Sequence, residues 1–168
     1  LNAAMPHIGH FQTRSRGTVC GSIAHSDPSS ELPLCLATLG GVVVLKSART
    51  NRVLPASEFQ TGMLATARQP DEMVAAVRFP TRKPGAGYAF AEMTQRYGDF
   101  AICAVAAVVS GRSVRLGVGG VAGRPTVRDW PELPTHEIED ALNDFAWDLE
   151  ASDDLHATAI YRRELVRR

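Results

Sequence analysis

The amino-acid sequence predicts an α+β fold in two parts. Helices and short strands form the first part, and a three-stranded antiparallel sheet followed by helices forms the second. Short runs rich in β-branched residues, typical of strands, occur in both parts. Apolar residues repeat at helical spacing near the C-terminus. Between the parts, residues 80–87 (Pro-Thr-Arg-Lys-Pro-Gly-Ala-Gly) are typical of a linker, so we expect domains at 1–82 and 83–168.

The first part opens with a polar segment and one predicted helix. Residues 9–31 are dense in small residues and turn formers, which predicts mainly a loop. Asp27 followed by Pro28 is a good helix start, because Asp27 supplies a cap oxygen and Pro28 needs no N–H in the first turn. Residues 32–39 can continue that helix, and Gly40-Gly41 ends it.

Short strands follow this helix. We expect strands at 42–45, 52–54 and 72–79, with a helical piece at 55–59. The last strand alternates, which predicts a half-buried strand. Its buried side would carry Met73, Ala75, Val77 and Phe79.

The second part reads as a meander followed by two helices. Strand-length pieces at 88–95, 100–109 and 113–119 are separated by turns at Gly98-Asp99 and at 110–112. One helical stripe consists of Ile138, Leu142, Phe145, Ala146 and Leu149. A second consists of Ala157, Ile160, Tyr161 and Leu165, with Arg162, Arg163, Arg167 and Arg168 near its C-terminal end.

Composition argues against several classes of function. The 168 residues carry no net charge and no basic stripe with interleaved aromatic residues, so nucleic acid is not an expected partner. The longest apolar runs, 39–45 and 100–109, are too short to span a membrane, and no secretion signal opens the chain. The three cysteines lack metal-ligand spacing, which favours two buried thiols and one loop thiol in a reducing cytoplasm.

Catalytic and metal-binding patterns are not evident. The sequence contains no GxSxG, HExxH, Walker or GxGxxG motif, and its five histidines have no ligand spacing. Acidic pairs such as Asp71-Glu72 and Asp153-Asp154 are expected in solvated turns and helix starts. We therefore expect no catalytic residue and no metal ligand in this chain.

The segment from Arg16 to Glu31 is the best candidate for a functional site in the sequence. Small residues at Thr18, Gly21 and Ser22 would let backbone N–H groups approach a phosphate or a ribityl chain. A capped turn without any ligand would have the same composition, so physical chemistry alone leaves both readings open.

Family resemblance narrows this choice. The segment 11–33, which contains Arg-Gly-Thr-Val-Cys-Gly-Ser and Ala-His-Ser-Asp-Pro, resembles the second flavin-binding motif of the molybdopterin dehydrogenase FAD-binding family. Further similar motifs follow in family order: Phe59-Gln-Thr-Gly62, Asp71-Glu72, Val77-Arg-Phe-Pro80, Arg96-Tyr-Gly-Asp-Phe-Ala101, Leu116 to Pro125, and Tyr161-Arg-Arg163. The resemblance covers nearly the whole chain, and it implies a mixed or antiparallel sheet with helices in the first part.

The resemblance implies a set of FAD contacts. The loop residues Thr18, Val19, Cys20, Gly21 and Ser22 would lie against the pyrophosphate and ribityl, with His25 at the pocket edge. Glu31 would accept hydrogen bonds from ribityl hydroxyls, because a carboxylate only accepts and sugar hydroxyls donate. Asp27 is expected to act first as a helix cap and second as a flavin contact, and Gly98-Asp99 resembles a turn near the flavin but also fits a plain hairpin.

Two departures from the family pattern stand against flavin binding by this chain alone. Cys20 replaces a usual glycine, which would cost roughly 1–2 kcal/mol if that position needs positive φ, and could crowd the pyrophosphate. The family's first, glycine-rich flavin loop has no counterpart, and the chain begins at Leu1. We therefore expect an N-terminally truncated chain.

The function implied by the resemblance is that of an electron conduit. Electrons would originate at a molybdopterin site on a large subunit and pass through 2Fe-2S clusters of a small subunit to FAD. The FAD would then pass them to NAD, oxygen or another acceptor. A dimer of such heterotrimers is one expected assembly. The first alternative is a truncated, non-flavin homologue with a structural role. The second is an enzyme with Cys20 as nucleophile and His25 as its base.

Overall fold

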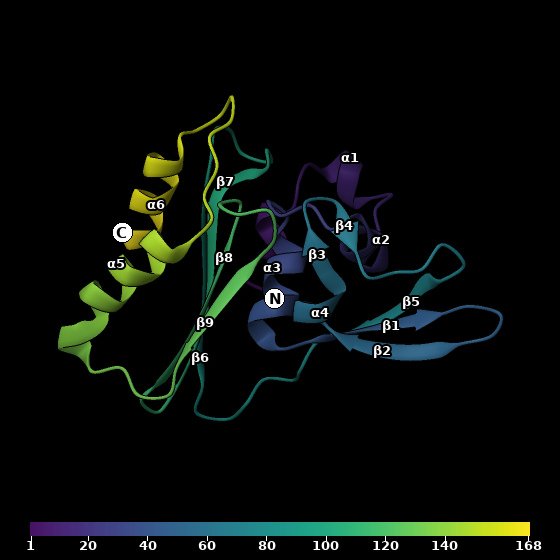
Figure 1. The fold of residues 1–168 in the computed structure, drawn as a ribbon, viewed down its shortest axis with the longest axis horizontal. Helices are drawn as coiled ribbons and strands as arrows, with labels where there is room; N and C mark the ends of the chain where they lie inside the picture. Colours follow the sequence, from purple (N-terminus) through teal and green to yellow (C-terminus); the bar gives the residue numbers. More distant parts are fainter.

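The computed structural model describes residues 1–168 and places them in two packed parts (Figure 1). In the first part, the elements are η1 (Met5–His7), α1 (Phe11–Arg14), α2 (Val19–His25), α3 (Glu31–Leu39), β1 (Val42–Lys46), β2 (Asn51–Pro55), α4 (Ala56–Phe59), β3 (Gln60–Gly62), β4 (Ala65–Thr66) and β5 (Met73–Arg78). In the second part they are β6 (Gly87–Thr94), β7 (Ala101–Ser110), β8 (Ser113–Gly119), β9 (Thr126–Trp130), η2 (Thr135–Glu137), α5 (Ile138–Asp148) and α6 (Ala159–Arg167).

Antiparallel sheets form the framework of both parts. The order β2-β1-β5 makes a three-stranded sheet, and β3-β4 make a small hairpin. The second part is a meander in the order β6-β7-β8-β9. The α+β class is confirmed, but this sheet has four strands where the sequence predicted three. The fourth, Thr126–Trp130, was missed because it is short, follows a glycine- and proline-rich loop and carries charged residues.

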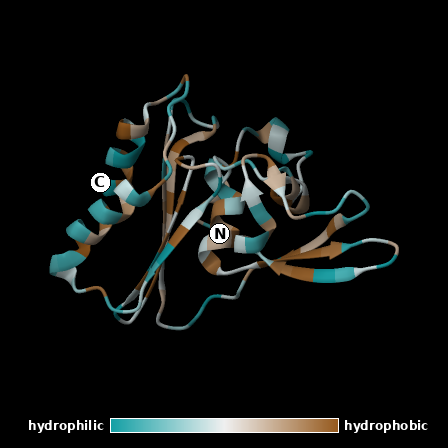
Figure 2. Cartoon of the chain, viewed as in Figure 1, coloured by the Kyte–Doolittle hydropathy of each residue, from teal (hydrophilic) through white to brown (hydrophobic).

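Helices cover both faces of the four-stranded sheet (Figure 1). On one face, α5 and α6 pack over a core that includes Cys103, Val118 and Phe145. On the other face, Leu34 of α3 packs against alanines 101, 104 and 106 of β7. Because both faces of β7 are covered, its long apolar run is explained by burial, and the hydropathy colouring shows hydrophobic residues along the sheet (Figure 2).

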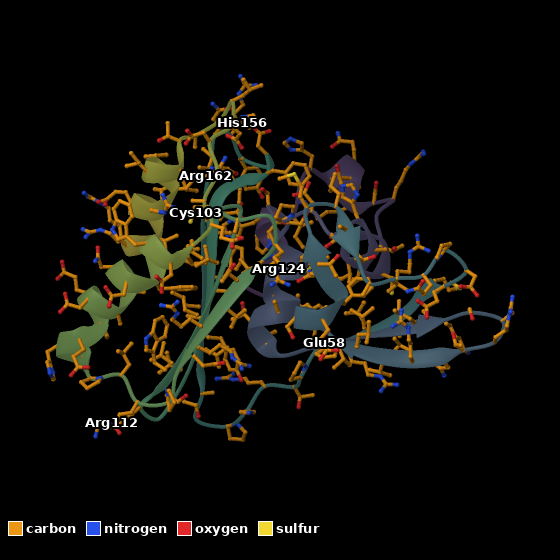
Figure 3. All side chains as sticks on the ribbon, in the orientation of Figure 1. Glu58, Cys103, Arg112, Arg124, His156 and Arg162 are labelled. Carbon is orange, nitrogen blue, oxygen red and sulfur yellow. The ribbon has the colours of Figure 1, made fainter.

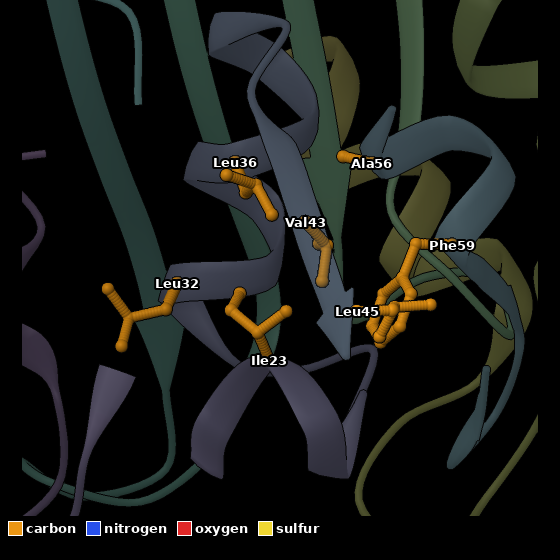
Figure 4. Packing of buried hydrophobic residues seen from close by; sticks show 7 residues of the cluster. All are labelled: Ile23, Leu32, Leu36, Val43, Leu45, Ala56 and Phe59. Atoms are coloured by element: carbon orange, nitrogen blue, oxygen red, sulfur yellow. The ribbon is translucent and has the colours of Figure 1, made fainter. Parts of the chain in front are cut away.

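A separate core fills the first part between α2, α3, α4 and the three-stranded sheet. Its buried members are Ile23, Leu32, Leu36, Val43, Leu45, Ala56 and Phe59 (Figure 4). Helix α3 ends as predicted, because Gly40 adopts the left-handed conformation with φ of 69° that an L side chain resists. The predicted strands at 42–45 and 52–54 and the helical piece at 55–59 are confirmed.

The face of β5 was predicted only in part. Val77 and Phe79 pack against the first core as expected, but Met73 and Ala75 are exposed and Val74 takes the inward place. The pairing of β5 with β1 shifts at this point, since Leu45 pairs with Val74 and Val44 with Ala76. A bulge of this kind inserts one unpaired residue and switches the strand's faces.

Glu72 corrects the expectation of a solvated acidic pair. Its side chain is buried and takes two hydrogen bonds from Arg52, from Nε to Oε1 at 2.7 Å and from Nη2 to Oε2 at 2.8 Å. The Gln69 N–H adds a third bond at 2.8 Å. These donors lower the pKa of Glu72 from its ordinary 4.5 to about 2, with the Arg52 bonds as the largest cause.

No helix of the chain combines the length and the apolar character needed to cross a membrane.

Phe59→Ala is expected to lower the free energy of unfolding by about 3–5 kcal/mol, because it leaves a cavity in the first core. Urea denaturation measures this. Phe11→Ala is the matched control, since the Phe11 side chain is 73% exposed and its loss should cost less than about 0.5 kcal/mol. Equal losses in the two variants would contradict the assignment of Phe59 to the core.

Glu72→Gln is expected to destabilise the protein at neutral pH and to lose this effect in acid. The folded-state pKa of Glu72 lies below its ordinary value, so its stabilising contribution is present above pH 4.5 and is lost as the pH falls toward about 2. Unfolding free energies of both proteins measured across that range should converge at the acid end. A constant difference would show that Glu72 acts without titrating.

Candidate functional site

A cavity of about 980 Å³ lies where the first helices meet the β6–β7 turn. One wall is formed by residues of the N-terminal segment, among them Met5, Ile8 and His10. The start of α2 and the start of α3 contribute a second wall, and the segments around Phe100 and Arg162 close the third side. Both parts of the chain therefore build this cavity.

The polar segment predicted as loop contains a helix at this cavity. Residues Val19–His25 form α2, whose first turn is capped by Thr18: the Thr18 Oγ1 accepts a hydrogen bond from the Gly21 N–H at 2.9 Å. The prediction was wrong here because weak helix formers dominate the segment, while a side-chain cap and packing of Ile23 in the core stabilise the turn. A β-carbon at Gly21 would lie 2.9 Å from that same Oγ1, so glycine fits the capped turn closely.

The structure brings together six of the eight residues expected to contact a flavin. Those that line the cavity are Thr18, Val19, Gly21, Ser22, His25 and Glu31. Cys20 and Asp27 are not among the lining residues. Cys20 lies inside α2 and does not have a positive φ, so it does not carry the backbone strain that a side chain at a positive-φ position would cause.

Asp27 does not cap α3. That helix begins at Glu31 with Ser30 in the cap position, and the Asp27 carboxylate instead accepts a hydrogen bond from the Ser29 N–H at 2.8 Å. The expected start is therefore three residues early, because the Asp-Pro pair forms a tight turn before the helix rather than its first turn. The turn is pinned further by the Gly120 N–H, which donates to the Pro28 carbonyl at 2.8 Å.

Glu31 is the carboxylate of the cavity. It is the first residue of α3, lines the cavity and is only 5% exposed. Burial raises its pKa, its own backbone N–H opposes this, and of the nearby charges Glu92 and Asp27 raise the pKa while His7 lowers it. A carboxylate held in this setting favours a ligand that supplies hydrogen-bond donors.

The β6–β7 turn forms part of the cavity, as the sequence allowed. Gly98, with φ of 87°, and Asp99 line it together with Phe100, whose side chain is 61% exposed. A β-carbon at Gly98 would fall 2.5 Å from Cε1 of His10, so the turn and the N-terminal segment are in direct contact.

Arg162 is a cavity residue that was expected only as one of several basic residues near the C-terminal end of its helix. It is 4% exposed, and its guanidinium donates to the carbonyls of Ile102 (2.6 Å) and Gly120 and to the Asp154 carboxylate. The predicted stripe residues Ile160 and Tyr161 are 70% and 46% exposed instead. Arg162 and His156 reach the cavity from the C-terminal part, above Cys103 (Figure 3). Local sequence could not reveal these acceptors, since they come from other segments of the chain.

The cysteines follow the expectation except in one respect. Cys35 and Cys103 are buried, and burial raises the pKa of their thiols to about 11 and about 12. The third, Cys20, is partly exposed in α2 rather than in a loop. No group of three or more His, Cys, Asp and Glu side chains is placed to hold a metal ion.

The fold and the cavity define the class: an α+β protein with a cavity between two packed parts. Comparison with known sequences then places it. Residues 1–82 match the family described as FAD binding domain in molybdopterin dehydrogenase. The first part of the chain belongs to this family, and the chain as a whole is a homologue of its medium subunits.

Three relatives illustrate the similarity. The chain is 37% identical to the nicotine 6-hydroxylase medium subunit of Paenarthrobacter nicotinovorans, over 99% of this chain and 62% of that one. It is 30% identical to the caffeine dehydrogenase subunit beta of Pseudomonas sp. (strain CBB1), over 99% of this chain and 64% of that one. Reconstituted CO dehydrogenase from Oligotropha carboxidovorans matches with a TM-score of 0.89 and 26% identity, over 98% and 62% of the two chains. The chain thus spans about three fifths of these relatives.

Thr18→Ala is expected to lower the free energy of unfolding by about 1 kcal/mol, because the first turn of α2 loses its cap. Thr18→Ser keeps a hydroxyl at the cap and should lose much less. Urea denaturation of the two variants beside the native protein measures the difference. If the two variants lose the same free energy of unfolding, the Thr18 cap does not stabilise α2.

Proposed function

We propose that this chain is part of the FAD-binding medium subunit of a molybdenum-containing hydroxylase or dehydrogenase. Residues 1–82 would be the latter part of its FAD-binding domain, and residues 83–168 its C-terminal domain. The observation that carries the proposal is the gathering of Thr18, Ser22 and Glu31 around one cavity, inside the range that matches the FAD-binding family.

The cavity residues fit part of a flavin cofactor. At about 980 Å³ it can take a large share of a dinucleotide. The first turn of α2 has backbone N–H groups without partners inside the helix, which suit a pyrophosphate, and the Glu31 carboxylate suits ribityl hydroxyls. The replacement of glycine by Cys20 does not oppose this fit, because Cys20 neither has a positive φ nor lines the cavity.

The chemistry would come from the cofactor, and the chain would supply placement. Bound FAD supplies reversible two-electron and one-electron transfer. We propose that electrons arrive from 2Fe-2S clusters on a small subunit, fed by a molybdopterin centre on a large subunit, and leave to NAD, oxygen or another acceptor. Ser22 and Glu31 would orient the cofactor, while Phe100 and His156 border the cavity from the second part.

Relatives support this setting in general terms. They include subunits of enzymes named for nicotine, caffeine and carbon monoxide. We propose a heterotrimeric assembly, with a dimer of heterotrimers as its larger form, in the reducing cytoplasm. The substrate of the complex would be chosen outside this chain.

A non-flavin homologue with a structural role is the second candidate. The retained cavity and the buried Glu31 favour the flavoprotein instead.

Flavin retention by the purified protein tests the proposal. The visible absorption spectrum is recorded after FAD is added and the excess is removed by gel filtration, for this chain and for the full-length subunit as encoded. Glu31→Gln should weaken FAD binding roughly tenfold or more, because a charged acceptor of hydrogen bonds is replaced.

Glu58→Gln is the matched control. Glu58 lies on α4, away from the cavity, and should leave FAD binding unchanged (Figure 3). If the full-length subunit stays colourless, the flavoprotein proposal fails and the structural homologue is supported.

A further inference from the structure

The segment that forms the N-terminal wall of the cavity is attached to the second part by two titratable side chains, His7 and Glu92, which do not line the cavity. Met5, Ile8, Gly9 and His10 line the cavity, but His7 does not. Its ring instead lies against the second part of the chain, with Nδ1 3.3 Å from the Glu92 carboxylate.

The partner of His7 is an unusual carboxylate. Glu92 lies on β6, where its side chain is only 4% exposed. One of its oxygens faces Nδ1 of His7, and the other, Oε2, is buried without a hydrogen-bond partner. Phe90, two residues earlier on the same strand, packs against the His7 ring with centroids 5.2 Å apart. The imidazole is therefore fixed between an aromatic ring and an incompletely satisfied carboxylate.

The other titratable groups near His7 and Glu92 are also carboxyl groups, so they do not neutralise the Glu92 carboxylate. Glu31, on α3, and Asp27, before α3, bring two further carboxyl groups to the same region, and Glu92 and Glu31 interact with each other. Burial raises the pKa of Glu92, and His7 is the group that opposes this shift. The cluster therefore contains three carboxyl groups and one histidine.

We propose that His7 and Glu92 are positioning residues that form a pH-dependent latch, holding the wall formed by residues 5–10 against β6. When His7 is protonated, the pair is a charge-assisted hydrogen bond across the two parts of the chain. When His7 is neutral, an ionised Glu92 remains buried beside Glu31 with one neutral partner, which weakens the attachment of the wall. Imidazole side chains in general change charge between about pH 5 and 8, and this interval is therefore the one over which the latch is tested.

Two uncharged contacts hold the same wall and provide the control. The Tyr97 hydroxyl donates to the Pro6 carbonyl at 2.8 Å, and Gly98 packs on His10. Neither contact involves the His7–Glu92 pair. Tyr97→Phe removes the hydrogen bond to Pro6 without changing His7 or Glu92.

The first measurement needs no cofactor. Thermal unfolding of the native protein, Glu92→Gln and His7→Gln is followed from about pH 6 to about pH 8. The latch predicts that the native unfolding temperature falls by a few degrees relative to Glu92→Gln as the pH rises, because the variant has no buried carboxylate to leave unpaired. His7→Gln should lack the native pH dependence, and Tyr97→Phe should run parallel to the native protein.

The second measurement rests on the proposed function and uses FAD as the ligand. FAD affinity of the native protein should fall roughly fivefold across that interval, and Glu92→Gln and His7→Gln should flatten this slope. Tyr97→Phe should weaken binding equally at every pH. His10 and His25 also line the cavity, but they are present in all variants, so the difference between slopes isolates the latch.

The two measurements separate the two proposals. No FAD binding in any variant, with the predicted pH-dependent difference in unfolding temperature, overturns the flavin function and supports the latch. FAD binding with identical pH slopes in the native protein and Glu92→Gln, and a constant difference in unfolding temperature, overturns the latch and leaves the flavin function standing.

Discussion

Close packing of α3 between the two parts is the constraint on which the rest of the structure depends. The helix contacts β7, β8 and β9 on one side and α2 and α4 on the other. It can lie this near the sheet because β8 has no side chain at Gly117, where any β-carbon would clash with Thr38 of the helix. Gly119 is also close, with Leu34 3.3 Å from the place of its missing β-carbon. A helix between two apolar surfaces needs apolar residues all round, and α3 has them.

The position of α3 decides the position of the site. Leu32 and Leu36 face the first core, while Leu34 faces the second sheet. With both sides fixed, the first residue of the helix, Glu31, is placed at the cavity, and the preceding turn is tied to Gly120 of the second part. The cavity is therefore a product of docking the two parts, and neither part contains it alone.

Buried polar side chains are satisfied to different degrees in this structure. Arg162 crosses from α6 to the carbonyls at the ends of β7 and β8, so one cation satisfies backbone acceptors that the strands leave open. Removing the guanidinium would leave these buried carbonyls without this donor, and an unpaired buried acceptor costs free energy. Glu92 and Gln60 are different, since each has a buried side-chain atom that lacks a partner. Glu92 is therefore better explained by its effect on the site than by stability.

Much of this architecture could be predicted from local sequence. The β-branched run 42–45 formed a strand, Gly40 ended its helix, and Gly98 and Gly111 made their turns, because each depends on the conformational preference of the residue itself. The resemblance that rested on segment 11–33 and the later motifs also identified the family, and most of the residues named from it line one cavity.

The remaining features depend on partners far away in the sequence. Helix α2 forms because Ile23 reaches a core, although its residues favour a loop. A bulge against β1 decides which side of β5 is buried, and carbonyls of other strands decide that Arg162 points inward. The sequence by itself determined most of the local elements and the family. Only the tertiary structure decided which side chains share the cavity, because burial, strand register and hydrogen-bond partners are set by contacts between segments that local preference does not encode.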